Sequence, residues 1–403
     1  MFKKNVLAVA VTAVGFSGSV LALEPAPIKV GEAKFIPTLD VNVTSDSNIR
    51  ASNAFKESAT VTSIAPKFLF EADTRNSAYQ LEYKANHRQY NGDYSDGLTD
   101  HGLAARGIFD IDVRNRLKLE ATHDRRESIE NPVSLTQLGS RVGSTGIGAD
   151  YFFGAPEAMF NIELGTRMNL IRSTDNDVAT KGIDRDFKQV NASLLYRVSP
   201  KTQLELEGRL GETNYIESAS KVKDSTQNSV LAGLRWEATA QTTGRAKAGY
   251  EQRKTDIKTT ERPSWEVAVD WSPVTYSTVT LSSQQATQDG TLANQLNPIT
   301  NLNSQTGFTA IQSARHSASW NHAWSDRFKT TVSYARVEEQ FVQDLGGASD
   351  RTDTFNQASL VLTYALRRWV DLEAGYTYSD RDSNTALRTF DRNQVMLGVS
   401  MSL

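Results

Sequence analysis

The chain has 403 residues, of which 39% are hydrophobic and 23% are charged. Its 44 lysines and arginines nearly balance its 47 aspartates and glutamates, so the formal net charge is only −3. This balance excludes the one-sided charge of a protein that binds nucleic acid electrostatically. Cysteine is absent, so disulfide bonds do not stabilise the fold.

The first 22 residues predict a secretory signal peptide. Lysines make a positively charged start, residues 6–14 form a short apolar core, and small residues precede cleavage after Ala22. This core is shorter than the ~18–20 residues that a membrane-spanning helix needs, so a retained anchor is the less favoured interpretation. We expect residues 23–34 to form a periplasmic N-terminal segment and residues 35–403 to form one membrane domain.

From residue 35 onwards, apolar and polar residues alternate with a period of two over segments of roughly ten residues. Leu39, Val41 and Val43, for example, alternate with Asp40 and Asn42. No later run is apolar enough for a helical span, and strands with one apolar face are typical of a wall between lipid and water. The pattern predicts an all-β fold. We expect a single transmembrane antiparallel up-and-down β-barrel of about 18 strands, with roughly 16 to 18 as the range.

Short and long connectors alternate between these predicted strands. Since outer-membrane barrels have short periplasmic turns and longer extracellular loops, the short turns should face the periplasm. The longest loop, at residues 285–307, is a candidate to fold into the lumen. Short turns are predicted at 73–77, 113–115, 154–157, 199–202, 241–244, 272–276 and 366–369. Long loops are predicted at 44–58, 88–100, 123–139, 172–184, 212–227, 253–263, 285–307, 337–353 and 379–389.

Aromatic residues recur a few positions before the predicted short turns. Because aromatic rings prefer the membrane interface, this spacing predicts a periplasmic aromatic girdle. The alternative is that strands favour aromatic residues in any case. The girdle candidates are Phe153, Tyr196, Trp236, Trp271, Trp320 and Tyr364.

A barrel of this strand number is too wide for side chains to fill, so we expect a water-filled channel. Acidic and basic residues are interleaved on the face predicted to point inward, which argues against strong anion selectivity. These residues either contact a passing hydrophilic solute or form cross-strand salt bridges with one another. The pore-lining candidates are Arg106, Arg116, Lys118, Glu120, Glu163, Arg167, Glu205, Glu207, Arg209, Arg235, Glu237, Arg245, Lys247 and Glu251.

The sequence contains no recognisable catalytic or metal-binding motif. Five histidines are present, but no signature ties them to a serine or to a pair of carboxylates, and His322 is predicted to lie in a turn. With no cysteine and no HExxH motif, a metal site is not expected. We expect a channel without enzymatic activity, cofactor or metal.

The first predicted strand, residues 35–49, reads FIPTLDVNVTSDSNI. It resembles the first strand of the EpsL-like β-barrel porin 2 proteins, outer-membrane proteins of exopolysaccharide biosynthesis clusters. In that family the strand has a proline, here Pro37, then alternating apolar residues and an aromatic-Asp-Asx-Asn element, here represented by Asp46 and Asn48. Ser45 stands where the family usually has the aromatic residue.

The resemblance implies export of a secreted polysaccharide, an exopolysaccharide or biofilm matrix, across the outer membrane of a Gram-negative bacterium. A periplasmic polysaccharide-export protein would then be a partner, together with outer-membrane lipid. The last strand, ending at Leu403, is similar to the signal that the barrel-assembly machinery reads, with leucine where phenylalanine is commoner. Two other hypotheses stay open: a general or sugar-uptake porin, and a structural or adhesive barrel whose loops bind external partners.

Overall fold

The computed structural model describes most of the chain. The described residues are 27–54, 56–91, 97–130, 138–174, 181–239, 241–289, 308–343, 351–385 and 388–402. The predicted cleavage site at Ala22 lies outside them, as does most of the predicted loop at 285–307. Within the described ranges, no helix has the length and apolar character needed to cross a membrane.

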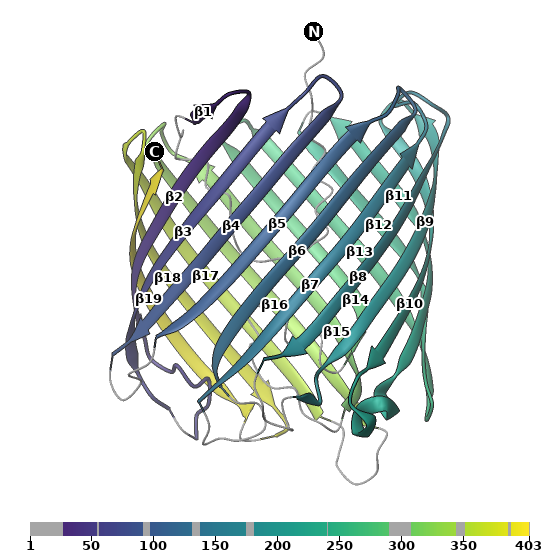
Figure 1. Ribbon diagram of the computed structural model, residues 1–403. Helices are drawn as coiled ribbons and strands as arrows, with labels where there is room; N and C mark the ends of the chain where they lie inside the picture. The colour runs from purple at the N-terminus through teal and green to yellow at the C-terminus, as the bar shows by residue number, and fades with distance from the viewer. Residues whose placement is uncertain are drawn as a thin grey trace.

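Eighteen long strands form one closed barrel (Figure 1). Each strand from β2 to β19 pairs antiparallel with the next along the chain, and β19 pairs with β2 to close the wall. The prediction of an up-and-down antiparallel barrel is confirmed. The strands are β2 (Ala33–Asp46), β3 (Ala59–Asp73), β4 (Ser77–Tyr90), β5 (Leu98–Asp110), β6 (Asn115–Glu130), β7 (Leu138–Phe153), β8 (Phe160–Ser173), β9 (Arg185–Ser199), β10 (Thr202–Tyr215), β11 (Ser225–Thr239), β12 (Thr242–Thr255), β13 (Thr259–Val274), β14 (Ser277–Asp289), β15 (Phe308–Ala323), β16 (Phe328–Gln343), β17 (Arg351–Arg367), β18 (Val370–Ser383) and β19 (Phe390–Ser402).

Two small elements accompany the barrel strands. The short strand β1 (Ile28–Val30) folds back on the start of β2 through a turn in which Gly31 has a φ of 64°, a conformation that favours glycine. The 3-10 helix η1 (Ser218–Lys223) connects β10 to β11. Figure 1 shows β1 and the C-terminus at the same end of the barrel. The barrel wall thus begins at Ala33, two residues before the expected start at residue 35.

The two faces of the wall alternate residue by residue. Leu81 and Leu103 are exposed on the apolar outer face. The intervening positions point the other way, so Gln80 and Arg106 lie opposite each other on the inner face, where the Arg106 guanidinium donates to the Gln80 side-chain oxygen at 3.1 Å. Successive side chains of a strand point to opposite faces, which gives one face to lipid and one to water.

The strands are longer than the sequence pattern indicates. They contain 13 to 17 residues, whereas crossing the hydrocarbon layer takes about 9–11. Beyond the membrane both faces of a strand meet water, so the alternation that marks a lipid-facing strand disappears. The predicted long loop at 253–263 is therefore wrong, because β12 ends at Thr255 and β13 begins at Thr259. His322, predicted in a turn, lies within β15.

The short turns are closed by local hydrogen bonds. Between β5 and β6, the Asp112 carboxylate accepts the backbone N–H of Arg114 at 2.7 Å and that of Asn115 at 2.9 Å. The bond from Arg114 is the main reason that the pKa of the Asp112 carboxyl is lowered. Aspartate is common in turns because its side chain can accept such nearby N–H groups.

The seam between the first and last barrel strands is short and is reinforced by side chains. Strand pairing runs from Thr38 opposite Ser402 to Asp46 opposite Gln394, and the Ser47 N–H extends it by donating to the Asn393 carbonyl oxygen at 3.0 Å. Asp46 is 1% exposed and accepts hydrogen bonds from Arg392 Nε and from Gln394 Nε2, each at 2.9 Å. A second nitrogen of Arg392 completes the ion pair, so this carboxylate binds β2 to β19.

The other two residues of the first-strand motif contact the same region. Asn48 is fully buried, donates to the Asp391 carbonyl oxygen at 3.0 Å and accepts the backbone N–H of Ser52 at 3.3 Å. The Pro37 carbonyl oxygen accepts the Ser402 hydroxyl at 3.1 Å. All three motif residues therefore fasten the first strand and its loop to the last part of the chain.

Asp46→Ala is expected to destabilise the barrel by roughly 1.5–3 kcal/mol, because it leaves the Arg392 guanidinium without its charged partner. Urea unfolding of the protein in lipid vesicles measures this loss. Asp382→Ala is the matched control. Asp382 is exposed on the outer face of β18, at the same end of the barrel as Asp46. Equal unfolding midpoints for the two variants would contradict the role given to Asp46.

Candidate functional site

All of the predicted pore-lining residues lie on the inner face of the barrel, except Glu237, which lies in a register irregularity at the end of β11. On the β5–β8 side they form separate, partly exposed ion pairs: Arg106 Nε contacts Glu120 at 2.8 Å, and Arg167 contacts Asp150 at 3.3 Å. The inner face also carries Arg116 and Lys118 of β6 and Arg245 of β12.

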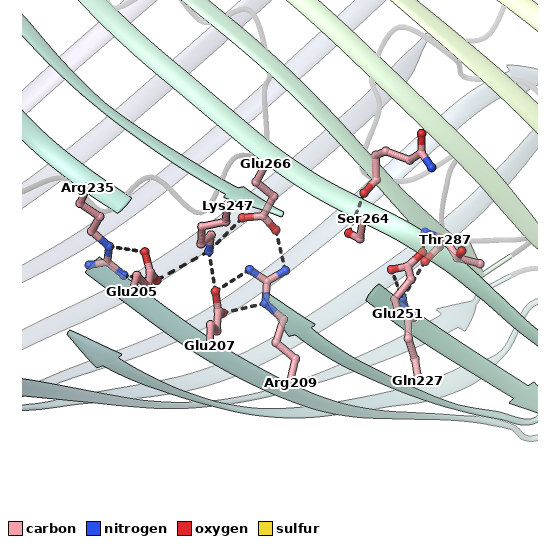
Figure 2. A network of polar contacts seen from close by, with 11 residues as sticks. Glu205, Glu207, Arg209, Gln227, Arg235, Lys247, Glu251, Ser264, Glu266 and Thr287 are labelled. Carbon is pink, nitrogen blue, oxygen red and sulfur yellow. Dashed lines mark hydrogen bonds and ion pairs between the residues drawn. The ribbon is translucent and has the colours of Figure 1, made fainter. Parts of the chain in front are cut away.

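On the β8–β13 side the charged residues form one connected network (Figure 2). Arg235 of β11 donates to both carboxylate oxygens of Glu163 on β8 at 2.9 Å. The same guanidinium donates to Glu205 on β10 at 2.7 Å. Arg235 thus links β8 and β10, the strands on either side of β9. Its planar guanidinium group binds both carboxylates in a bidentate manner.

Lys247 of β12 is the centre of this network. Its ammonium nitrogen lies 2.5 Å from Glu207, 3.1 Å from Glu266 and 3.8 Å from Glu205, and its side chain is only 4% exposed. Arg209 contacts Glu207 at 2.7 Å and Glu266 at 2.5 Å. We call this set, together with Glu163 and Arg235, the charged face. Its charges nearly cancel, with four carboxylates around three cations.

A glycine makes room for the central lysine. Gly233 of β11 lies opposite Glu205 on one side and opposite Lys247 on the other. A Cβ atom at Gly233 would come within 2.0 Å of the Ala246 carbonyl oxygen and 2.6 Å of the Lys247 Cα. Because no side chain stands between them, Lys247 can reach across β11 to a carboxylate two strands away.

A second group of polar side chains forms hydrogen bonds at the place where β13 and β14 stop pairing. Backbone pairing of β13 with β14 ends at Trp265 opposite Gln285, although both strands continue further. Beyond this point the Thr287 carbonyl oxygen accepts from Gln227 Nε2 at 2.9 Å, and its N–H donates to the Glu251 carboxylate (Figure 2). Side chains of β11 and β12 therefore occupy backbone groups that a neighbouring strand would otherwise pair.

Next to the charged face, the inner face of β14–β18 carries a band of hydroxyl groups, with Arg315, Lys329 and Glu373 on the same face beyond the band. Ser282 and Ser317 share a hydrogen bond at 2.6 Å, as do Ser333 and Ser359. All of these side chains except Ser333 are partly exposed. We call this set the hydroxyl face: Thr280, Ser282, Ser317, Ser319, Ser333, Ser359 and Thr377, which lie opposite one another on consecutive strands.

The hydroxyl face was not among the sequence predictions, because inward residues were identified there by their charge. Serine and threonine at alternate positions, such as Thr278, Thr280 and Ser282, were the available signal. The sequence predictions also missed Gly233 and Gln227, whose roles depend on strand register rather than on a local motif.

The predicted girdle residues lie on the outer face at the short-turn end. Five of them stand three residues before the last residue of β9, β11, β13, β15 or β17, and Phe153 is the last residue of β7. Phe153, Trp271 and Tyr364 are 44%, 49% and 41% exposed. The rings therefore occupy a common level of the wall; their role as a membrane girdle stays a prediction.

The histidines do not assemble a catalytic group with the carboxylates of the lumen. His87, His101, His123 and His316 each share a hydrogen bond of 2.9 to 3.0 Å with a hydroxyl group on the outer face. Among the described residues, no three histidine or acidic side chains gather in a way that could hold a metal ion.

Residues 22–403 match the family described as "Putative beta-barrel porin 2". The chain belongs to this family. It is similar to the solved structures of Pseudomonas aeruginosa OpdL (11% identity, 93% of this chain and 100% of that chain, TM-score 0.49), a BenF-like porin from Pseudomonas fluorescens Pf-5 (12%, 92% and 99%, 0.49) and the siderophore receptor PirA from Acinetobacter baumannii (7%, 93% and 81%, 0.47). The comparison with curated protein sequences finds no match.

A porin of this kind is a channel in the outer membrane of a Gram-negative bacterium. Its lumen offers two chemically different surfaces to a hydrophilic solute. The charged face holds its ions in mutual pairs and presents little net charge, whereas the hydroxyl face presents neutral donors and acceptors.

Lys247→Met is expected to destabilise the porin by about 3–5 kcal/mol, because the buried carboxylates of Glu205 and Glu207 lose their shared cation. Denaturant unfolding in vesicles measures the change. Arg245→Met is the matched control: it removes a cation two residues earlier on the same strand and face, one that has no ion-pair partner in the described part of the chain. If both variants unfold at the same denaturant concentration, Lys247 is not the centre of the network.

Proposed function

We propose that this porin exports a secreted polysaccharide through its lumen. The observation that carries the proposal is the hydroxyl face, a neutral strip of donors and acceptors that extends over five consecutive strands, β14–β18. A polysaccharide presents closely spaced hydroxyl groups of its own. These would exchange hydrogen bonds with the serine and threonine side chains, none of which carries a charge that would bind the glycan tightly.

The charged face would support the neighbouring part of the wall. Lys247 and Glu205 are almost completely buried, and each is paired within the network. Breaking such pairs would leave uncompensated buried charges, so the network would keep its shape as the solute passes. A neutral or weakly charged glycan would accordingly follow the hydroxyl face.

The first-strand resemblance supports a polysaccharide as the cargo. A periplasmic polysaccharide-export protein would meet the short-turn end, which in outer-membrane barrels faces the periplasm. Ile28 and Val30 of β1 are 47% and 58% exposed at that end and would be available to such a partner. The barrel-assembly machinery would read the last strand, β19. A general or sugar-uptake porin is the alternative, because a hydroxyl face would also suit small sugars.

Deleting the gene is expected to reduce secreted exopolysaccharide, with the polymer retained in the periplasm, while uptake of small sugars is unchanged. Quantifying extracellular and periplasmic carbohydrate checks this. Normal secretion with slower sugar uptake would favour the uptake porin instead. Normal secretion with reduced attachment to surfaces would favour an adhesive barrel.

In planar bilayers, a neutral glucose oligomer such as maltoheptaose is expected to reduce the ionic current of the porin. Ser319→Ala combined with Thr377→Ala removes two partly exposed hydroxyls of the hydroxyl face. We expect the half-blocking concentration to rise about fivefold for each hydrogen bond lost. The control combines Ser45→Ala with Thr62→Ala on the outer face. An equal change in the control pair would show that the hydroxyl face does not contact the sugar.

A further inference from the structure

Two neighbouring turns at the periplasmic end carry an unusual set of exposed residues. Trp324 and Arg327 lie in the turn between β15 and β16, and Arg367, Arg368 and Trp369 lie at the turn between β17 and β18. Both tryptophans are prominent on the surface, at 59% and 48% exposure, and all three arginines are exposed. The turns touch, because the backbone N–H of Ala365 donates to the Arg327 carbonyl oxygen at 2.8 Å.

The first of these turns continues an aromatic cluster on the lipid-facing wall. The ring of His322 lies 4.3 Å from that of Trp324, 5.2 Å from that of Trp320 and 5.5 Å from that of Tyr276, measured between centroids. Trp320 belongs to the outer face, where it lies opposite the exposed Val332. The cluster is therefore at the boundary between lipid and water, where aromatic rings are favoured.

The indole N–H groups of Trp320 and Trp324 form hydrogen bonds with the barrel wall. Trp320 Nε1 donates to the Ser277 hydroxyl, and Trp324 Nε1 donates to the Thr330 hydroxyl, each at 2.9 Å. The rings are thus held in place before any ligand arrives, which lowers the ordering cost of binding. In contrast, Nδ1 of His322 is buried and has no hydrogen-bond partner among the residues that the structure describes.

A hollow lies between the aromatic cluster and the arginine turns. We call it the periplasmic rim pocket, and its walls include Tyr276, His322, Trp324, Arg327, Arg367 and Arg368. None of the three arginines has an ion-pair partner in the described part of the chain, unlike Arg209 and Arg235 of the charged face. Lys329 and the single carboxylate of Asp326 also line it, so the pocket combines an excess of positive charge with an aromatic wall.

We propose that the periplasmic rim pocket binds the headgroup of an anionic phospholipid from the periplasmic leaflet. The phosphate would be held by the guanidinium groups of Arg327, Arg367 and Arg368, whose planar forks suit phosphate oxygens. The acyl chains would lie along the outer face beside Trp320. This inference does not depend on the cargo of the porin, because the pocket is on the rim rather than on the hydroxyl face.

An acidic periplasmic protein would also complement three arginines. The lipid is favoured because the positive charge is continuous with rings on the membrane-facing wall, so one amphiphilic molecule would contact both parts. An extended acidic protein surface would contact the arginines but would leave the lipid-facing Trp320 and Tyr276 side of the cluster unused.

Native mass spectrometry of the full folded barrel in a non-ionic detergent tests the proposal. Phosphatidylglycerol and phosphatidylethanolamine with identical acyl chains are the probes. We expect one phosphatidylglycerol to bind at least about tenfold more tightly than phosphatidylethanolamine. Combining R327Q, R367Q and R368Q should raise the phosphatidylglycerol Kd about 100-fold.

The matched control combines R75Q, R114Q and K201Q, which remove three cations from other short turns and should leave lipid binding unchanged. Heat-modifiable gel mobility verifies that each variant is folded. Equal affinity of the unaltered porin for both lipids, or an equal loss in both triple variants, would overturn the proposal. Displacement of the lipid by glycerol phosphate at matching concentration would also overturn it, since a free phosphate would then suffice. So would recovery of a bound acidic protein in place of lipid.

Discussion

Within a membrane, every backbone N–H and C=O group must find its partner inside the protein, because lipid offers none. A β-barrel satisfies this constraint only when its first and last strands pair, so the wall depends on the seam between β2 and β19. Here the seam is fastened near both ends: Ser402 donates to the Pro37 carbonyl oxygen, and Arg392 pairs with Asp46. The short motif that indicated a family therefore has a physical role in closing the barrel that is separate from any cargo.

Closure also creates a lumen, and its charged and hydroxyl faces stabilise their polar side chains in different ways. On the charged face, Lys247 neutralises carboxylates from strands on both of its sides, which is possible because Gly233 leaves space between them. On the hydroxyl face, neighbouring serines bond to one another without charge. The first arrangement holds strands in register, and the second leaves hydroxyl groups that can change partners at small cost.

The sequence was sufficient for the features that depend on local periodicity. Alternation predicted the barrel and its strand number, and the aromatic positions agree with the strand ends. The alternation pattern failed where strands extend beyond the membrane, as at residues 253–263. Both faces of a strand are polar there, so its sequence resembles that of a loop. The pairing of Arg235 with Glu163, 72 positions apart in the chain, could not be predicted either. Such contacts depend on the register of several successive strand pairs, which no single segment encodes.

The early end of pairing between β13 and β14 makes the barrel wall unequal around its circumference. Where two described strands pair along their full length, as β11 and β12 do at their outer ends, widening the barrel would require the rupture of a backbone ladder. Beyond Trp265 and Gln285, side chains join β11, β12 and β13 to β14 instead: Glu251 and Gln227 bind the backbone of Thr287, and the Ser264 hydroxyl binds the Gln285 carbonyl oxygen. Side-chain contacts of this kind can re-form with water as substitute partners in the lumen. In this outer part of the barrel, the separation of β13 from β14 is therefore set by side-chain contacts instead of by a backbone ladder.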